Sequence, residues 1–215
     1  MILIVTLGFD EKFALRSILR RGVKEGDELI AFLPYGGDMR GEKAFLSLKQ
    51  TLLKMLPELK IKKVEINIKD PYEAISRIRK IFRELSLKGE VIIINISGGQ
   101  RLLIIETLAA ALSLNLKKAE LEIETEDSSF YFNSTLDIML PMELDTLDLE
   151  ILKKVAEKGS TKLAKLAEIS EIPKTTLWRK LNRLTELKLL EKNGDTYFLS
   201  DLGRSRVTSI TNYAD

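Results

Sequence analysis

The feature that most constrains the fold is an apolar strand that stops at two glycines. Residues 92–96 read Ile-Ile-Ile-Asn-Ile, a nearly unbroken apolar run typical of central strands in parallel sheets, which are covered on both faces. Ser97, Gly98 and Gly99 follow, and glycines let the backbone turn tightly. From Gln100 onward the apolar residues recur with helical spacing. The sequence therefore predicts a buried strand, a tight turn and a helix.

The start of that helix is a candidate anion-binding site. A helix N-terminus presents amide groups that have no partner within the helix, and its dipole attracts negative charge. Arg101 adds a cation in the first turn, which is electrostatically unfavourable unless an anion lies nearby. The simplest ligand is a phosphate. In the alternative interpretation the glycines only let the strand and helix pack closely, and Arg101 is a solvated surface cation.

The chain up to about residue 132 alternates strands with helices. The elements expected before residue 92 are strands at 2–7, 28–33 and 64–68, a helix capped by Asp10, a helix at 42–56, and a helix capped by Asp70 that runs to Leu87. This order predicts right-handed crossovers and a doubly wound, mostly parallel α/β sheet with helices on both faces. Residues 118–125 and 130–132 predict a hairpin-like, half-exposed edge.

Two glycine turns are expected to meet in such a sheet. Strand order reverses between the first and fourth strands, and ligands bind beyond the C-terminal ends of those strands. The first strand ends in Gly8, Phe9 and Asp10, and the fourth ends in the turn at 97–101. Asp10 is interpreted as a helix cap rather than an acid catalyst. The breaker-rich segment 35–41 is either a flexible connection or a lid over the same crevice.

Composition excludes several kinds of site. The chain has no Cys and no His, so it contains no disulfide, Cys-containing zinc site, Cys nucleophile, Ser-His-Asp triad or imidazole acid–base catalyst. It also lacks the glycine motifs of P-loop NTPases and dinucleotide-binding dehydrogenases. No apolar run approaches a membrane span and no signal-peptide pattern is present, so we expect a cytoplasmic protein without a membrane partner. We predict no metal, cofactor or catalytic residue.

The pattern changes around Pro141. We expect a first domain at 1–136, a linker at 137–144 and a second domain at 145–215. The second domain is predicted to hold a helix from Leu147 ending at Gly159, a short helix capped by Ser160, a helix from Pro173 to Leu190, and a hairpin with an Asn193-Gly194 turn. Three helices followed by a hairpin are typical of a winged helix-turn-helix.

Charge and helix periodicity favour DNA as the partner of this second domain. Residues 145–215 carry 13 Lys and Arg against 11 Asp and Glu, whereas residues 1–144 carry 21 of each. With Leu177, Leu181 and Leu184 facing the core, the opposite face of the third helix presents donors and cations, as a recognition helix requires. The predicted DNA-binding residues are Lys174, Thr175, Thr176, Trp178, Arg179, Asn182 and Arg183 on the helix, and Lys192 and Asn193 on the wing. Trp178 either stacks on the DNA backbone or packs at the domain edge.

The motifs at 5–10 and 97–101, in this order and followed by the predicted winged helix, resemble a known family. It comprises regulators with a CRISPR-associated Rossmann fold (CARF) domain and a C-terminal winged helix-turn-helix, found in archaeal type I-A CRISPR systems for antiviral defence. The resemblance covers the whole chain. It implies a homodimer in which two CARF domains form one cleft on the two-fold axis, which suits a two-fold symmetric ligand.

By the same resemblance, the cleft binds a cyclic oligoadenylate, above all cyclic tetra-adenylate, and the winged helix binds double-stranded promoter DNA. The residues implied to line the cleft are Thr6, Gly8, Phe9 and Asp10, and those implied to meet the phosphates are Ser97, Gly98, Gly99, Gln100 and Arg101. The predicted ligand-binding set also includes Leu7, Tyr35, Gly36 and Gly37. The leading interpretation is a ligand-responsive transcription regulator. The alternative is a ring nuclease, in which Arg101 and the amides stabilise charge while a 2′-hydroxyl attacks.

Overall fold

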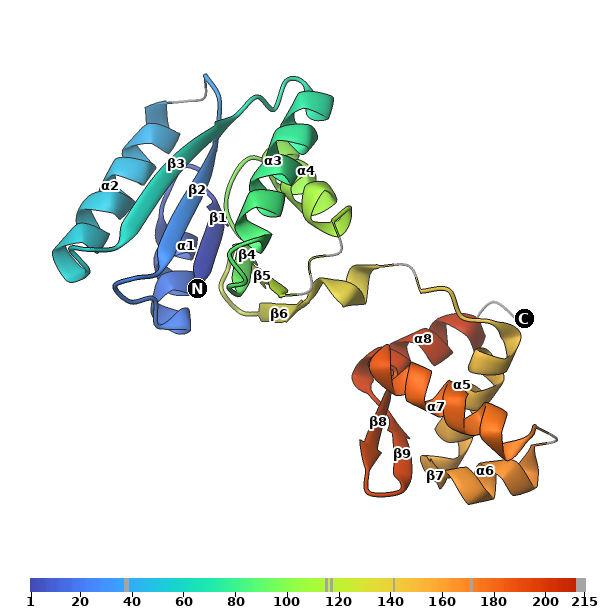
Figure 1. Cartoon of the computed structure of the whole chain (residues 1–215). Helices are drawn as coiled ribbons and strands as arrows, with labels where there is room; N and C mark the ends of the chain where they lie inside the picture. Colours follow the sequence, from blue (N-terminus) through green and yellow to red (C-terminus); the bar gives the residue numbers. More distant parts are fainter. Residues whose placement is uncertain (37–38, 115, 117, 141, 171, 212–215) are drawn as a thin grey trace. The chain divides into compact units, whose positions relative to one another are not determined.

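The structure is a computed structural model that describes residues 1–36, 39–114, 116, 118–140, 142–170 and 172–211. The chain divides into two compact units, Met1–Leu140 and Pro141–Asp215, which are coloured from blue to yellow and from yellow to red in Figure 1. The division falls inside the segment 137–144 that we expect to link two domains. Each unit is described by itself below.

The first unit is built around one six-stranded sheet. Its strands are β1 (Ile2–Thr6), β2 (Glu28–Pro34), β3 (Lys60–Ile66), β4 (Ile92–Asn95), β5 (Ala119–Glu124) and β6 (Tyr131–Thr135), in the spatial order β3-β2-β1-β4-β5-β6. The first five are parallel, and β6 runs antiparallel to β5 at the edge. The predicted mostly parallel sheet is confirmed, including the reversal of strand order at β1 and β4.

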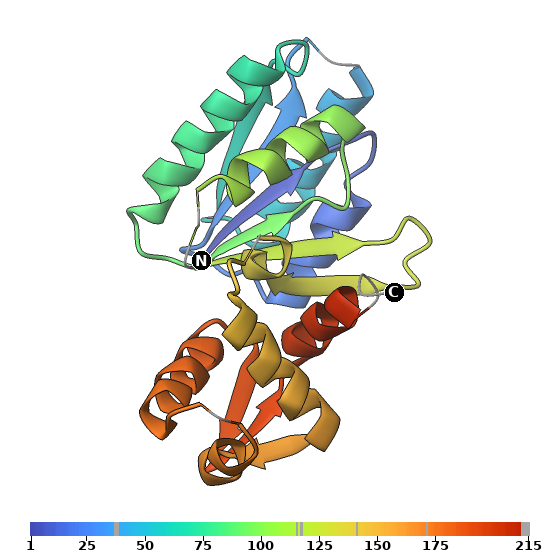
Figure 2. The ribbon, with the colours of Figure 1, turned by 90° about the vertical axis from the view of Figure 1, so that its right-hand side faces the viewer.

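Helices cover both faces of this sheet. They are α1 (Lys12–Arg21), α2 (Met39–Met55), α3 (Pro71–Ser86) and α4 (Arg101–Leu112), and a short 3₁₀ helix (Leu136–Met139) follows β6. Side chains alternate along a strand, so Leu3 and Val5 pack with α1 and α2 while Ile2 and Ile4 pack with α3 and α4. Figure 2 shows α3 and α4 together on one face of the sheet.

Several boundaries in the first unit differ from the prediction. Strand β3 spans 60–66 rather than 64–68, and α2 begins at Met39 rather than Glu42. Asp70 caps α3 as predicted, because its carboxylate accepts the amides of Tyr72 and Glu73. Glu11, not Asp10, occupies the N-cap position of α1, although the Asp10 carboxylate accepts the Lys12 amide at 3.1 Å.

The predicted hairpin at the edge of the sheet is confirmed, with β6 as the partly exposed edge strand, but the expected half exposure of residues 118–125 is wrong. Strand β5 lies inside the sheet between β4 and β6, and the side chains of Glu122 and Glu124 are buried. The alternation of Leu and Glu correctly places these carboxylates on one face. However, that face is covered by α1, whose arginines neutralise the carboxylates, so the polar face is not a solvent face.

The second unit combines four helices with a small antiparallel sheet. Its elements are α5 (Thr146–Lys158), β7 (Ser160–Lys162), α6 (Leu163–Ile169), α7 (Lys174–Glu186), β8 (Leu190–Asn193), β9 (Thr196–Leu199) and α8 (Asp201–Thr211), with strand order β7-β9-β8. Gly159 ends α5 with φ of +68°, as predicted. Leu177, Leu181 and Leu184 are fully buried, which confirms the predicted core face of α7.

Three local predictions for this unit are wrong. Ser160 starts strand β7 instead of capping a helix, because residues 160–162 pair with β9. Helix α7 ends at Glu186 rather than Leu190. The predicted hairpin itself is confirmed, but Asn193 pairs with Thr196, so the loop is Gly194-Asp195 rather than Asn193-Gly194, and Gly194 has a positive φ. Helix α8 was not predicted.

Candidate functional site

The two glycine turns meet beyond the C-terminal ends of β1 and β4. These strands are parallel neighbours in register, so the turns that follow them emerge side by side. A Cβ placed on Gly8 would lie 2.9 Å from the backbone nitrogen of Gly99, closer than real side chains approach. Gly99 has φ of +105°, and a Cβ there would lie 3.1 Å from Cβ of Thr6. The predicted convergence is confirmed, and we call residues 8–10 with 97–101 the lip.

Backbone amides of the lip are available to a ligand. The Ser97 amide donates to Oδ1 of Asn95 at 3.1 Å, and the Thr6 hydroxyl donates to the Gly98 carbonyl. In contrast, the amides of Gly98, Gly99 and Gln100 make no hydrogen bond with any residue that the structure describes. Amides without a partner at the start of a helix are the kind of donor that binds a phosphate group.

Arg101 is the first residue of α4, and Gln100 precedes it in the N-cap position. The Arg101 side chain is exposed and forms no ion pair within the described part of the chain. The positive end of the helix dipole and this cation lie together. An anion bound at the lip would therefore relieve a local excess of positive charge.

The crevice of one chain is small. A cavity of about 20 Å³ lies among lip residues and the start of α2, and is lined by Leu7, Gly8, Phe9, Leu33, Pro34, Gly41, Glu42 and Gln100. This is close to the smallest cavity that can hold one water molecule, roughly 10–15 Å³. A nucleotide would therefore lie over the lip rather than inside a pocket of a single chain.

The remaining residues predicted to line the cleft lie around this crevice. Phe9 is about half exposed, and the guanidinium of Arg40 stacks over its ring at 3.9 Å. Tyr35 is exposed after β2, and Gly36 follows it in a turn. Gly37 lies outside the described residues. Residues 39–41 belong to α2, so this part of the segment predicted to be a flexible connection or a lid is helical instead.

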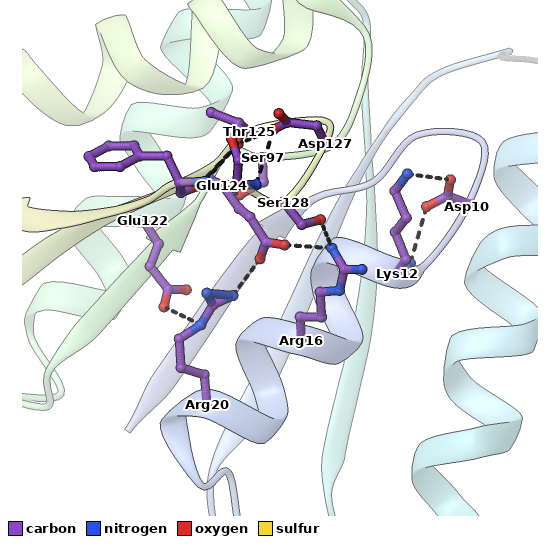
Figure 3. Close-up of polar contacts among 12 residues, drawn as sticks. Asp10, Lys12, Arg16, Arg20, Ser97, Glu122, Glu124, Thr125, Asp127 and Ser128 are labelled. Carbon is purple, nitrogen blue, oxygen red and sulfur yellow. Dashed lines mark hydrogen bonds and ion pairs between the residues drawn. The ribbon is translucent and has the colours of Figure 1, made fainter.

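A network of buried charges behind the lip was missed by sequence reasoning. Three arginines of α1 meet three glutamates of β5, with Arg16–Glu124 at 2.5 Å, Arg20–Glu124 at 2.6 Å, Arg21–Glu122 at 3.0 Å and Arg21–Glu120 at 2.8 Å. Figure 3 shows Arg16 and Arg20 reaching toward Glu122 and Glu124, close to Ser97. The sequence did contain a signal for this network. Glutamates alternate along β5, and three arginines lie close together on α1.

The protonation state of this network is biased toward charged carboxylates. Burial alone would raise the pKa of Glu122, but hydrogen bonds from Ser17, Tyr131 and Asn95 and the charge of Arg21 lower it. Burial and the hydrogen bond to Glu122 raise the pKa of Tyr131 to about 12. The network therefore holds a fixed negative charge next to fixed positive charges at neutral pH.

The first unit can be assigned to a family. Residues 1–135 match the family described as the Csa3 CRISPR-associated Rossmann-like domain. The chain belongs to this family. The matched Csa3-family domain contains both halves of the lip, and it ends before the second unit begins.

Solved structures resemble the chain only weakly. Protein VC1899 from Vibrio cholerae is 12% identical with a TM-score of 0.48, and the match covers 96% of this chain and 63% of that protein. A type III CRISPR defence DNA nuclease activated by cyclic oligoadenylate is 11% identical with a TM-score of 0.42, over 86% of this chain and 30% of the nuclease. The chain thus spans less than two thirds of either protein. No curated protein matches it.

A second candidate surface lies on the unit that follows the Csa3-family domain. An open groove of about 590 Å³ is lined by Leu163 and by five residues of α7, namely Lys174, Thr175, Thr176, Trp178 and Arg179. All five belong to the set predicted to bind DNA, and Trp178 is 54% exposed. We call this the α7 groove. Its lining combines an apolar floor with two cations that have no ion-pair partner among the described residues.

Two cations of α7 serve the unit's own structure. Nη1 of Arg183 lies 2.7 Å from Oδ2 of Asp148, and its Nη2 donates to the Glu143 carbonyl at 3.0 Å. Nζ of Lys180 lies 3.0 Å from Oδ1 of Asp148 and also contacts Asp145. These ion pairs join α7 to α5. The Arg183 side chain therefore contacts its own unit, whereas the sequence predicted that it contacts DNA.

The other predicted DNA contacts are spread over α7 and the hairpin. Asn182 is partly buried on α7, and Asn193 ends β8. Nζ of Lys192 lies 5.5 Å from the ring centre of Tyr197.

Within the described residues, no cluster of acidic side chains could hold a metal ion. No described helix has the length and apolar character needed to cross a bilayer.

Proposed function

We propose that the chain is a ligand-regulated DNA-binding protein of a CRISPR system. Its Csa3-family domain binds a cyclic oligoadenylate, and its second unit binds double-stranded promoter DNA. The observation that carries the proposal is the lip, where free amides, a helix N-terminus and Arg101 converge next to exposed aromatic rings. Amides and a cation suit phosphodiesters, and exposed rings suit adenine bases.

The shape of the lip supports a homodimer as the ligand-binding form. A cavity of about 20 Å³ leaves a nucleotide exposed on a single chain. On α4, which starts at the lip, Leu102 is 50% exposed and Ile105 is 62% exposed. A second copy packed on this apolar helix would bury both side chains and place two lips around one ligand. Cyclic tetra-adenylate, with two-fold symmetry and four phosphates, matches that arrangement.

The second unit supports the DNA half of the proposal. We propose that α5, α6 and α7 with the β8–β9 hairpin form a winged helix-turn-helix. In this arrangement α7 is the recognition helix, and the residues of the α7 groove contact base edges and phosphates. Lys192 and Asn193 on the hairpin contact the backbone. Arg183 is left out of the contact set because Asp148 and Glu143 hold it.

Titration of cyclic tetra-adenylate into the protein tests this function directly. We expect binding of one ligand per two chains, and a changed affinity for the chain's own promoter DNA at constant salt. By linkage, DNA must change ligand affinity by the same factor. Linear tetra-adenylate is the matched control ligand. Absence of binding by the cyclic ligand would remove the sensor role.

Cleavage of the ring is the competing function at the same lip. The lip offers Arg101 and free amides for charge stabilisation, but Asp10, its acidic side chain, is used at the start of α1. We therefore propose a sensor rather than an enzyme. Incubation of labelled cyclic tetra-adenylate with the protein, followed by chromatography, distinguishes the two because a ring nuclease yields linear product.

A further inference from the structure

Strand β4 carries a buried polar residue where an apolar one would be less costly. It reads Ile-Ile-Ile-Asn, and Asn95 is only 1% exposed. In the sheet register Asn95 lies opposite Glu122 of β5, which is 0% exposed. Buried amides and carboxylates destabilise a fold unless their hydrogen bonds are satisfied. Apolar residues of similar size in their place often give the same or a higher stability. Stability alone therefore does not explain this pair.

The Asn95 side chain is tied to the lip at one end and to Glu122 at the other. Its Oδ1 accepts the Ser97 amide at 3.1 Å, and its Nδ2 donates to Oε2 of Glu122 at 3.1 Å. The Ser97 hydroxyl in turn accepts the Glu124 amide at 2.9 Å. Because these bonds use the amide and an oxygen lone pair of Ser97, its hydroxyl proton stays free to be donated to an anion.

Glu122 also reaches the other half of the lip. Its carboxylate accepts the Ser17 hydroxyl and Nε of Arg21, the latter at 3.0 Å. Both residues belong to α1, the helix that begins directly after lip residues 8–10. One buried carboxylate is thus linked through Asn95 to residues 97–101 and through α1 to residues 8–10. Figure 3 shows the neighbouring part of this network, where Glu124 lies between Ser97 and the α1 arginines.

We infer that Asn95 and Glu122 are positioning residues of the anion-binding lip. They fix Ser97 so that its hydroxyl donates to a ligand phosphate, and they hold the two halves of the lip at a set distance. This inference rests on the proposed function of the lip. It adds two residues that contact no ligand themselves and act through Ser97 and α1.

Asn95→Leu tests the inference because leucine keeps the size of the side chain and removes both hydrogen bonds. Ile93→Ala is the matched control, since Ile93 lies on the same strand and the same face and its truncation leaves a core cavity. Both variants are expected to lower the unfolding temperature. Only Asn95→Leu is expected to speed hydrogen exchange of the Ser97 amide in the ligand-free protein, because that amide loses its acceptor, and to weaken cyclic tetra-adenylate binding by roughly tenfold.

A paired exchange provides the rescue. Asn95→Asp alone places two carboxylates opposite each other and is expected to weaken ligand binding strongly. Combined with Glu122→Gln, it restores one amide and one carboxylate with their positions exchanged, and the aspartate can still accept the Ser97 amide. Recovery of affinity in the double variant supports positioning, whereas additive losses contradict it.

The outcomes separate this inference from the proposed function. Equal exchange rates and equal affinities in Asn95→Leu and Ile93→Ala would overturn the positioning role. Failure of the unmodified protein to bind cyclic tetra-adenylate would overturn the sensor function, and the exchange rate of the Ser97 amide would still decide whether Asn95 orders the lip. If Asn95→Leu does not fold, Ser17→Ala removes one donor to Glu122 and is expected to give a smaller increase in exchange of the Ser97 amide; no increase would contradict the inference.

Discussion

The lip and the α7 groove are built in opposite ways. The lip consists mainly of backbone, with two glycine turns in contact and a cavity of about 20 Å³. The α7 groove consists of side chains along one helix and encloses about 590 Å³. A backbone site depends on how closely its turns approach, so a single added methyl group can close it. A side-chain site depends on separate contacts, so each substitution removes a limited part of its function.

The buried charges show the same contrast. Behind the lip, the polar network joins residues of α1, β4 and β5, and it ends at Ser97. In the second unit, Asp148 pairs with Lys180 and Arg183 and joins α5 to α7, away from the residues that line the groove. Buried charge supports the candidate ligand site directly in the first unit, and it supports helix packing in the second.

Gly8→Ala is expected to give the largest effect. The new Cβ would lie 2.9 Å from the Gly99 nitrogen, and neither backbone can move freely because each follows a central strand. We expect the loss of cyclic tetra-adenylate binding and a decrease of about 2 kcal/mol in the free energy of unfolding of the first unit. Calorimetric titration and thermal unfolding followed by circular dichroism measure the two effects.

Gly41→Ala is the control for that substitution. Gly41 lines the same cavity, but a Cβ there would lie 3.6 Å from the Gly8 carbonyl, which is ordinary contact. Its position within α2 also favours alanine by roughly 0.5–1 kcal/mol. If both alanines reduced ligand binding equally, the contrast between a closely packed turn and its surroundings would be wrong.

The sequence predicted the part of the fold that depends on periodicity and glycine. The apolar run of β4, the strand–helix alternation and the two glycine turns identified the sheet order at β1 and β4, and hence the place of the lip. The charge network was not predictable in the same way. Alternation places Glu120, Glu122 and Glu124 on one face of β5, but it does not reveal whether water or an arginine-bearing helix covers that face.

The same limit applies to α7. Helical spacing correctly placed its leucines in the core and Thr175 and Arg179 outside, although Lys180 is buried. It could not show that Lys180 and Arg183 reach carboxylates of α5, because that contact depends on how two helices pack. The local sequence also gave a wrong prediction at 160–162, where a short strand forms because β9 lies next to it. Tertiary contacts determine the secondary structure of such segments.

Arg179→Ala is expected to give the next largest effect, on DNA binding. Arg179 lines the α7 groove without an ion-pair partner in the described part of the chain, so it is free to contact a base edge. Its loss should weaken binding to the promoter by about 1–3 kcal/mol and relax the preference for promoter over unrelated DNA. Fluorescence anisotropy with both DNAs at one salt concentration measures this.

Arg183→Ala separates a structural arginine from Arg179, which we propose to contact DNA. Arg183 lies on the same helix but is held by Asp148 and Glu143. We expect this variant to unfold at lower denaturant concentration and to keep its preference for promoter DNA. A greater loss of sequence preference in Arg183→Ala than in Arg179→Ala would reverse the roles given to the two residues.

Lys192→Ala is expected to have a smaller and more uniform effect. The Lys192 ammonium lies near the Tyr197 ring on the hairpin, and the proposed function assigns it a phosphate contact rather than a base contact. Affinity should fall by a similar factor for all DNA sequences, and the salt dependence of binding should decrease by about one phosphate contact. Titrations at several salt concentrations test this, and an unchanged salt dependence would argue against a wing contact.

The smallest effect is expected from acid titration of the second unit. The hydrogen bond from Lys180 and the amide of Asp148 hold the pKa of Asp145 at about 2, below its ordinary value of 3.8. Because the folded pKa is lower than the unfolded one, the ionised carboxylate stabilises the folded unit above pH 3.8, and this contribution disappears as the pH falls to about 2. Asp145→Asn should therefore be less stable than the unmodified protein at pH 5 and equally stable near pH 2.

The single tryptophan makes this difference measurable in one unit, because Trp178 lies on α7 and the first unit contains no tryptophan. Urea unfolding followed by its fluorescence at several pH values gives the stability of the second unit alone. Asp195→Asn, in the hairpin loop, is the control for removal of a charge outside these ion pairs. A stability difference between Asp145→Asn and the unmodified protein that stays constant from pH 5 to pH 2 would show that Asp145 acts through its helix-capping shape. In that case the charged contact between α5 and α7 would rest on Asp148, the carboxylate that both Lys180 and Arg183 reach.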